Sequence, residues 1–445
     1  MTSPADSKNI VEKKAENLSQ ADMNKILAVF KEKLDMESIA YLHSCVHCGL
    51  CADSCHYYLS DKSTASIPAK KLDLIARVFK KHFSRGIEKW LPLSGAEKFT
   101  RKMAHEWVDS LFGRCSLCGR CSLNCTMGIN IFSLIRAARG AMAEAGLVPL
   151  GLQSTINTAL EKGNNMGISK EDWLETILWL EDELRQDIND PKATLPVDKE
   201  GAECLYAINP REAMFFPLSI TAAGKIFHAA KENWTFSSEN FDVTNYGLYS
   251  GDDEAAGKIS ERLIRSMDQL GCGTLILTEC GHGYNSNRWE APEWLQKDID
   301  FKVNSIIQSI ADYIRKGRIR LDPSKNPKKT TLHDPCNLVR LGGVIEDQRF
   351  VLKQSVQNFV EMKPNRENNY CCGGGGGQLA MTQYADRRIK AGRIKADQIK
   401  KSGAEVVVTP CHNCIDQLIE LNKHYKLGIE IKTLSEVVAD ALILN

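Results

Sequence analysis

The chain has 445 residues, of which 57 are basic, 56 are acidic and 16 are cysteine. Two or more compact domains fit in this length, because a single hydrophobic core stops growing at about 250 to 300 residues. The net charge of +1 argues against a nucleic-acid partner recognised by overall basicity. Neither a secretory leader nor an apolar run that could span a bilayer is visible in the sequence. We therefore expect a cytoplasmic protein whose reduced cysteines bind metal or do redox chemistry.

The first half of the chain is predicted to be mainly helical. Apolar residues recur at helical spacing over 23–34, 72–83 and 173–184. Residues 187–203 are rich in charge and contain two prolines, which indicates a linker. Beyond this linker, short apolar runs alternate with helical patterns. We interpret four of these runs as buried strands, at 213–216, 274–277, 330–332 and 406–408.

The second half of the chain contains an internal repeat. Residues 215–219 match 332–336, with Pro217 on Pro335; 245–251 match 369–375; and 274–283 match 405–414. Two α/β units of roughly 100 residues would place their loops at the carboxyl ends of the strands, where open α/β sheets bind ligands. The predicted fold class is therefore α+β and multidomain, with a helical region followed by two tandem α/β repeats.

Two cysteine runs share the spacing Cys-x-x-Cys-x-x-Cys-x-x-x-Cys, which is typical of [4Fe-4S] ligand loops. They are Cys45, Cys48, Cys51 and Cys55, and Cys115, Cys118, Cys121 and Cys125. Three thiolates of each run would bind one cluster, while the fourth turns towards the other cluster. The expected ligand sets are Cys45, Cys48, Cys51 and Cys125 for one cluster, and Cys115, Cys118, Cys121 and Cys55 for the other. A structural zinc site is the alternative to these clusters. The sequence departs from the usual cluster pattern in one respect, since His56 and Thr126 follow the fourth cysteine of each run, where proline is usual.

The long helical stretch between the two runs, together with "CTMGINI" at 125–131, resembles the α-helical ferredoxin domain. That domain occurs in iron-sulfur subunits of succinate dehydrogenase, anaerobic glycerol-3-phosphate dehydrogenase and heterodisulfide reductase. The resemblance implies that two [4Fe-4S] cubane clusters lie within residues 41–150.

Five further cysteines form a second pattern near the C-terminus. They are Cys336, Cys371, Cys372, Cys411 and Cys414, and a run of five glycines follows the adjacent pair. The pattern resembles the Cys-Cys-Gly domain of heterodisulfide reductase catalytic subunits. In that family five thiolates hold a noncubane [4Fe-4S] cluster that reductively cleaves a disulfide. A phosphate-binding glycine loop is the alternative, but the Lys-Ser/Thr of a P-loop and the spaced glycines of a dinucleotide fingerprint are absent.

The first repeat has lost this pattern. Its matching positions are Leu218, Gly247, Leu248, Cys280 and Gly283, so we expect one noncubane cluster. This departs from glycolate oxidase-type subunits, which have two complete sites. Residues 40–445, with phrases such as "TECGHGY" at 278–284, instead resemble the heterodisulfide reductase D-like subunits of membrane-bound redox complexes in sulfate reducers, including the K subunit of the complex linked to dissimilatory sulfite reductase.

Residues near these ligands are candidates for supporting roles. We expect Cys280 and His282 to face the substrate thiol or the noncubane cluster, with a buried remnant cysteine as the alternative. His333, Asp334, His412 and Asn413 flank the ligands and are either tuning groups or ordinary turn residues. Cys204 and Cys272 are predicted to be inert core residues.

The division expected from these patterns is a tail and helix at 1–40, the ferredoxin domain at 41–150, a helical linker at 151–205, the degenerate repeat at 206–320 and the intact repeat at 321–445. The predicted function is passage of electrons through two cubanes to a noncubane site that reduces a disulfide or a protein trisulfide. The alternative is a conduit without its own substrate, between a flavoprotein dehydrogenase and a quinone-linked subunit.

The expected partners are a membrane cytochrome or quinone-linked subunit and other redox subunits, which would hold the chain at the inner face of the membrane. The resemblance also implies a small sulfur-carrier protein with C-terminal cysteines. The basic stretch 70–102 is either a solvated helix face or a docking surface for anionic lipid or an acidic partner.

Overall fold

The computed structural model describes residues 10–444 except 12, 85, 87–88 and 91–93. Its contacts divide the chain into two compact units. The first unit consists of Met1–Ser154, Tyr246–Asp253 and Tyr370–Lys395, and the second of Thr155–Asn245, Glu254–Asn369 and Ala396–Asn445. The units are therefore not contiguous in sequence, because one segment of each repeat belongs to the first unit. Both segments begin at the tyrosine of an Asn-Tyr pair.

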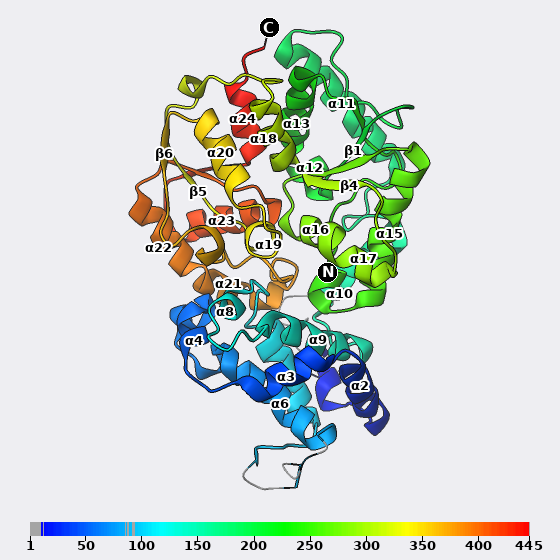
Figure 1. The fold of residues 1–445 in the computed structure, drawn as a ribbon, viewed down its shortest axis with the longest axis vertical. Helices are drawn as coiled ribbons and strands as arrows, with labels where there is room; N and C mark the ends of the chain where they lie inside the picture. Colours follow the sequence, from blue (N-terminus) through cyan, green and yellow to red (C-terminus); the bar gives the residue numbers. More distant parts are fainter. Residues whose placement is uncertain (1–9, 12, 85, 87–88, 91–93, 445) are drawn as a thin grey trace. The chain divides into compact units, whose positions relative to one another are not determined.

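The first unit is helical (Figure 1). Its main elements are α2 (Gln20–Glu32), α3 (Met36–Ser44), α4 (Leu50–Ser54), α5 (His56–Asp61), α6 (Pro68–His82), α7 (Arg101–Trp107), a π-helix (Val108–Phe112), α8 (Arg120–Leu123), α9 (Ile131–Glu144), α14 (Gly247–Ser250) and α21 (Ala385–Ala391). Helix α9 packs against α2, α6 and α14. Helix α6 begins with Pro68 and ends with Lys80, Lys81 and His82, which suits the helix dipole.

The second unit contains two four-stranded parallel sheets with the same strand order. The sheets consist of β1 (Cys204–Ala207), β2 (Trp234–Thr235), β3 (Thr274–Leu277) and β4 (Lys302–Ser305), and of β5 (Lys329–Leu332), β6 (Asn358–Val360), β7 (Val406–Val408) and β8 (Glu430–Lys432). Their orders are β2-β1-β3-β4 and β6-β5-β7-β8. The shared topology supports the predicted fold class of a helical ferredoxin-like region followed by two α/β repeats, and this prediction is confirmed.

Helices of the two repeats pack against each other in reciprocal pairs. The principal helices of the second unit are α10 (Leu150–Lys162, shared with the first unit), α11 (Lys170–Ile188), α12 (Pro210–Phe215), α13 (Pro217–Ala230), α15 (Asp253–Leu270), α16 (Gly281–Asn285), α17 (Ala291–Leu295), α18 (Ile306–Arg315), α19 (Cys336–Val339), α20 (Glu346–Ser355), α22 (Arg393–Ser402), α23 (His412–Tyr425) and α24 (Leu434–Ala441). Helix α13 packs on α24, and α18 packs on α20. Each pair joins an early helix of one repeat to the last helix of the other, and a single hydrophobic core includes strands of both sheets.

The predicted strand at 213–216 is wrong. Most of this segment belongs to α12, because Asn209 caps the helix in a capping box with Glu212, and Pro210 occupies its first turn. The first strand of the repeat is β1, which was not predicted. The predicted strands at 274–277 and 406–408 coincide with β3 and β7, and 330–332 falls within β5.

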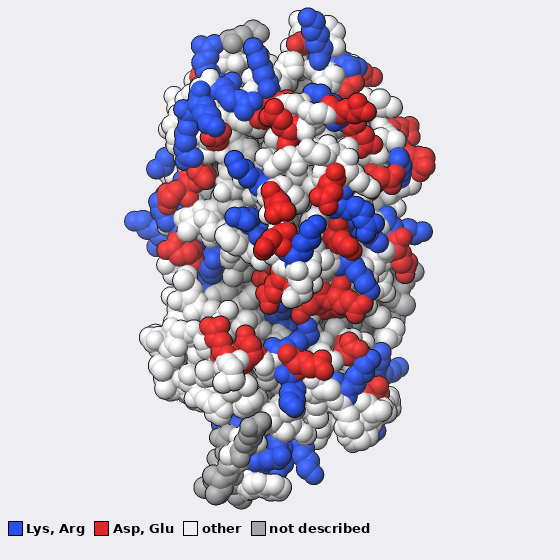
Figure 2. Space-filling view, turned by 45° about the vertical axis from the view of Figure 1, so that its right-hand side comes forward, with Lys and Arg blue, Asp and Glu red and all other residues white. Residues whose placement is uncertain are grey.

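Positive and negative side chains are interspersed over the face shown in Figure 2, as the balanced composition predicts. Part of the basic stretch 70–102, including Arg85 and Glu88, lies outside the described residues. Among the helices that the structure describes, none combines the length and the apolar composition that crossing a bilayer requires.

Candidate functional site

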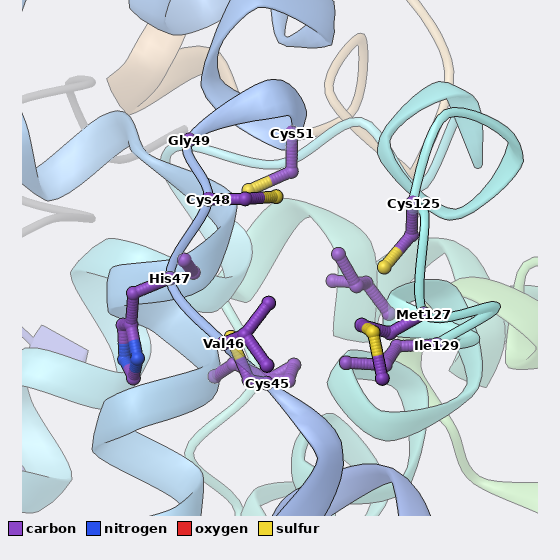
Figure 3. Close-up of a pocket in the computed structure, with 12 residues that line it drawn as sticks. Cys45, Val46, His47, Cys48, Gly49, Cys51, Cys125, Met127 and Ile129 are labelled. Atoms are coloured by element: carbon purple, nitrogen blue, oxygen red, sulfur yellow. The ribbon is translucent and has the colours of Figure 1, made fainter.

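The first cavity of interest lies between the two cysteine runs (Figure 3). It is lined by Cys45, Cys48 and Cys51 from one run and by Cys125 from the other. Cys48 and Thr126 bring the two runs together, with their side-chain sulfur and oxygen atoms 3.8 Å apart. The structure thus groups the four cysteines of one expected ligand set.

A second cavity is lined by the other expected set. It is lined by Cys55 from the first run and by Cys115, Cys118 and Cys121 from the second. Gly49 and Gly119 occupy equivalent places in the two loops, and each adopts a positive φ directly before a short helix. The local backbone therefore repeats, and the fourth cysteine of each run turns towards the other loop.

The sulfur atoms that line these cavities do not form a tight group. Among the residues that the structure describes, neither quartet has three sulfurs within 4.8 Å of one another. Four sulfurs bound tetrahedrally to one zinc ion at about 2.3 Å would lie closer together than this. The described residues that line the two cavities include no carboxylate. The donor set and its spacing therefore fit a thiolate-bound cluster better than a single zinc ion.

Buried cations distinguish the second cavity from the first. The cavity lining includes Lys71, which is 2% exposed and donates to the carbonyl of Arg114. Arg139 on α9 is fully buried and lies against the same loop, where its Nη2 donates to the carbonyl of Cys115 at 2.7 Å. Its hydrogen-bond partners are all carbonyl oxygens, its guanidinium lies over the ring of Phe112, and no carboxylate pairs with it among the described residues. The described lining of the first cavity contains neither lysine nor arginine.

The glycine-rich segment lies against the loop of this second cavity, within the first unit. Ser116 Oγ donates to Cys371 Sγ at 3.6 Å, and Arg139 Nη1 donates to the carbonyl of Gly376 at 3.1 Å. A hydrogen bond with Cys371, together with burial, raises the pKa of the Cys118 thiol. The amides of Gly373 and Gly374 donate to Cys371 Sγ and Cys372 Sγ, at 3.3 and 3.4 Å.

Gly376 illustrates why this segment needs glycine. Its φ is +67°, and a Cβ atom at this position would lie 2.4 to 2.7 Å from backbone atoms of Ser116. We expect Gly376→Ala to lower the melting temperature and to displace Cys371 Sγ from its hydrogen bond with Ser116. Gly428→Ala is the matched control, because Gly428 has the same φ but a Cβ atom there would have no other atom within 4 Å. Equal melting-temperature losses in both variants would contradict the role assigned to the Ser116 contact.

The remaining three cysteines of the C-terminal pattern belong to the second unit. Cys336 begins α19 after β5, while Cys411 precedes α23 and Cys414 lies in its first turn. All three are buried. A hydrogen bond with Cys414 lowers the pKa of Cys411 to about 7, against the effect of burial. Cys371 and Cys372 lie in the first unit.

The flanking residues have structural partners that the sequence did not reveal. Asp334 accepts from the buried Arg349 and Gln348, at 2.6 and 2.7 Å. The backbone oxygen of Asp334 also accepts from Asn369, two residues before Cys371. Asp334 therefore ties the Cys336 loop to the chain at Asn369.

His412 forms a buried ion pair with Glu212 of the first repeat, with Nε2 and Oε2 3.3 Å apart. Burial opposes its charge, but Glu212, together with Glu279 and Cys411, outweighs burial and raises the pKa of His412 to about 9. Glu212 also accepts from Thr278 and Ser219 at 3.1 Å. The first repeat therefore supplies a carboxylate that supports a cation beside Cys411.

The structure changes one position in the repeat alignment. Ala207 pairs with Leu277, and Leu332 pairs with Val408, at the ends of corresponding strands. Arg211 lies four residues after the end of β1, and Cys336 lies four residues after the end of β5. Arg211 is therefore the equivalent of Cys336, and the predicted equivalence of Leu218 and Cys336 is wrong. Leu218 lies on α13 and is 62% exposed. Arg211 forms an ion pair with Asp416 at 2.6 Å, so the first repeat has a charged contact where the second repeat has Cys336.

The other positions explain further why the first repeat departs from the second. Counting from the same strand ends places Cys280 opposite Cys411 and Gly283 opposite Cys414. A Cβ atom on Gly283 would lie 2.6 Å from the carbonyl oxygen of Val243 and 3.2 Å from Cys280 Sγ. This loop therefore has no room for a ligand side chain at that position.

Cys280 and His282 lie together in the second unit, with Sγ and Nδ1 3.3 Å apart. Burial, followed by the neighbouring Cys411, raises the pKa of Cys280 well above its usual value, and burial lowers that of His282 to about 3. On the predicted disulfide-reducing function, we expect Cys280→Ala to reduce turnover about tenfold with the iron content retained, because a neutral S–H group beside the expected ligand Cys411 is lost. Cys272→Ala is the control, and unchanged turnover in Cys280→Ala would remove Cys280 from the mechanism.

Comparisons with known proteins bear on both cysteine regions. Residues 41–129 match the family model of the 4Fe-4S dicluster domain, and residues 330–419 match that of the cysteine-rich CCG domain. The chain is 27% identical to the Hdr-like menaquinol oxidoreductase iron-sulfur subunit of Archaeoglobus profundus, over 94% of this chain and 83% of that protein. It is 24% identical to the D subunit of the dihydromethanophenazine:CoB–CoM heterodisulfide reductase of Methanosarcina barkeri, over 91% and 95% of the two chains. It is also 24% identical to the EtfAB:quinone oxidoreductase of Syntrophomonas wolfei, over 87% of this chain and 56% of that protein.

These matches confirm the predicted resemblance to the D subunits of heterodisulfide reductases. In both cysteine regions the chain is therefore similar to iron-sulfur oxidoreductase subunits of the heterodisulfide reductase-like type.

Proposed function

We propose that the chain passes electrons through two [4Fe-4S] cubane sites to a noncubane [4Fe-4S] site, where a disulfide or a protein trisulfide is reduced. The observation that carries this proposal is the match of residues 330–419 to the cysteine-rich domain, because this range contains all five C-terminal cysteines. In support, the two cysteine quartets line separate cavities, and Cys371 is hydrogen-bonded to the loop of one of them.

The proposed ligands follow these groupings. Cys45, Cys48, Cys51 and Cys125 would hold one cubane, and Cys55, Cys115, Cys118 and Cys121 the other. Cys336, Cys371, Cys372, Cys411 and Cys414 would hold the noncubane cluster, which supplies electrons to the sulfur–sulfur bond. For a disulfide the reaction consumes two electrons and two protons, breaks the sulfur–sulfur bond and forms two thiols.

Protein groups around these positions would adjust the redox chemistry. The amides of Gly373 and Gly374 stabilise negative charge on Cys371 and Cys372. The protonated His412, held by Glu212, would do the same for Cys411. The neighbouring Cys280 would keep its proton and remain a potential donor towards substrate or ligand sulfur.

We propose a membrane cytochrome or a quinone-linked subunit as the electron partner, together with other redox subunits. The names of the relatives from Archaeoglobus profundus and Syntrophomonas wolfei include menaquinol and quinone, which supports this choice. A small sulfur-carrier protein with C-terminal cysteines is the proposed macromolecular substrate. Such partners would place the chain at the cytoplasmic face of the membrane.

Anaerobic purification followed by metal analysis and EPR tests the proposal. We expect about twelve iron atoms per chain and, with a thiol product added, a paramagnetic signal from the third cluster. Cys371→Ala with Cys372→Ala should abolish disulfide reduction by a reduced dye while both cubane signals persist, and Cys272→Ala should change neither.

Other outcomes decide against the proposal. Zinc without iron would overturn it. Two redox-active cubanes with no thiol-dependent signal and no disulfide turnover would favour the conduit function instead.

A further inference from the structure

One surface of the first unit surrounds the most accessible cysteine. All sixteen cysteines are described, and Cys48 alone among them is exposed. Apolar side chains with large exposed fractions lie around the Cys48 loop: Val46 (62%), Leu50 (44%), Leu123 (46%) and Met127 (47%). Val46 and Met127 line the same cavity as Cys48 (Figure 3), and Leu123 lies on α8, which packs on α4. We call these four residues the neutral rim.

The two segments that carry the rim also lack charged residues. Residues 43–52 and 121–135 contain no Asp, Glu, Lys or Arg, although such residues make up 25% of the whole chain. His47 is the exposed titratable side chain nearest Cys48 in sequence, and its Nε2 lies 2.7 Å from Asp73. Gly49 and Gly128 add bare backbone, since a Cβ atom at either position would have no other atom within 4 Å.

Exposed apolar residues, methionine and a depletion of charge are together typical of the core of a protein–protein interface. A single exposed Leu would need no explanation, but four apolar side chains around one ligand loop do. An anionic lipid surface would instead attract lysine and arginine, which these two segments lack. The neutral rim therefore fits a protein with an equally uncharged face.

We propose that the neutral rim is the docking site of the redox partner, a protein that presents its own electron-transfer cofactor at an uncharged, apolar face. This inference rests on the proposed function, because it assigns an electron-carrying cluster to the Cys48 cavity. Docking here would exclude water from the exposed thiolate and bring the partner cofactor close to it. The second cavity offers no comparable approach, since none of its four cysteines is exposed.

Hydroxyl-radical footprinting of the native complex tests the docking site directly. We expect oxidation of Met127 to fall at least fivefold in the purified complex relative to the isolated chain. Met36 is the internal control, because it is 80% exposed on α3 and lies outside the rim. Equal oxidation of Met127 in both samples would overturn the inference.

A charge placed in the rim gives a second readout. The clusters in the native complex can be reduced by the complex's own electron donor or by dithionite. Leu50→Asp should lower the rate of reduction by the donor, divided by the rate of reduction by dithionite, about tenfold. Met36→Asp should leave that ratio unchanged, and an unchanged ratio in Leu50→Asp would overturn the docking site. The ratio is compared only at equal iron content, so absent clusters would count against the proposed function and not against the rim.

Two other occupants give distinct results, and either would overturn the inference. Protection of Met127 in the isolated chain, with dimers in analytical ultracentrifugation, would assign the rim to a second copy. Binding of the isolated chain to vesicles containing anionic phospholipid, abolished by Leu50→Asp, would assign it to lipid.

Discussion

Loss of Cys48 and Cys125 together should remove one cubane, whereas loss of Cys48 and Cys55 together should remove both. The structure places Cys48 and Cys125 around one cavity and Cys55 around the other. In Cys48→Ala/Cys125→Ala, both substitutions would strike the same cluster, and the iron content should fall by about four atoms. In Cys48→Ala/Cys55→Ala, each substitution would strike a different cluster, and the fall should be about eight.

The two double variants are controls for each other. If each cysteine run held its own cluster, the results would be reversed, with the larger loss in Cys48→Ala/Cys125→Ala. Iron and sulfide analysis with integration of the reduced-state EPR signal distinguishes the two arrangements. Alanine is preferable to serine here, because a serine oxygen can replace a thiolate as a ligand. Circular dichroism shows whether the variants retain the helical fold.

The spacing of cysteines carried most of what the sequence could predict about the site. Ligand loops are local, and a two-residue gap constrains where successive thiols point, so the groupings around Cys48 and Cys121 followed from sequence alone. The strands at 274–277 and 406–408 were equally accessible, because each is a short apolar run that ends before a polar turn.

The error at 213–216 shows the limit of apolar runs as evidence. A run of four apolar residues fits a buried strand or a helix equally well. Asn209, Pro210 and Glu212 form a helix start that decides between them, and these residues were visible in the sequence. Because this strand was misplaced, Leu218 was aligned with Cys336 where Arg211 belongs.

Buried charges were the residues that sequence analysis missed. Glu212 and His412 are far apart in sequence and meet only because the two repeats pack together. Arg139 left a weak signal, since it lies four residues after Ile135 and three before Met142, on the buried face of α9. An arginine at the edge of an apolar stripe is usually expected to reach solvent. Only the structure shows that Arg139 is buried and donates to carbonyl oxygens.

Arg139→Met should shift the reduction potential of the cluster proposed for Cys115, Cys118, Cys121 and Cys55 to a more negative value. Arg139 is buried without a carboxylate partner among the described residues, and reduction adds negative charge to the neighbouring cluster. At an effective dielectric constant of about 20, two unit charges separated by about 8 Å interact with an energy of about 2 kcal/mol. For a one-electron centre this equals about 90 mV.

The same substitution should weaken the contact between the cluster loop and the glycine-rich segment. Arg139 donates to carbonyls on both sides of this contact, at Cys115 and at Gly376. It also binds the carbonyls of Leu111 and Tyr249, so three separate segments meet at one guanidinium. Each carbonyl left unpaired in a buried place costs about 1 to 3 kcal/mol. We therefore expect a lower melting temperature and slower transfer of electrons to substrate.

Two further variants separate charge from architecture. Arg139→Lys keeps the charge but not the planar fork, so it should retain most of the potential while losing stability. Lys71→Met removes a second buried cation near this cluster loop, and with it one hydrogen bond to the carbonyl of Arg114. It should lower the potential while leaving the contact with the glycine-rich segment intact. Redox titration followed by EPR measures the potentials, and thermal unfolding measures the stability. If Arg139→Met assembles no cluster, Lys71→Met and Arg139→Lys still test the argument. An unchanged reduction potential in Lys71→Met would show that buried cations do not determine the reduction potential of this cluster.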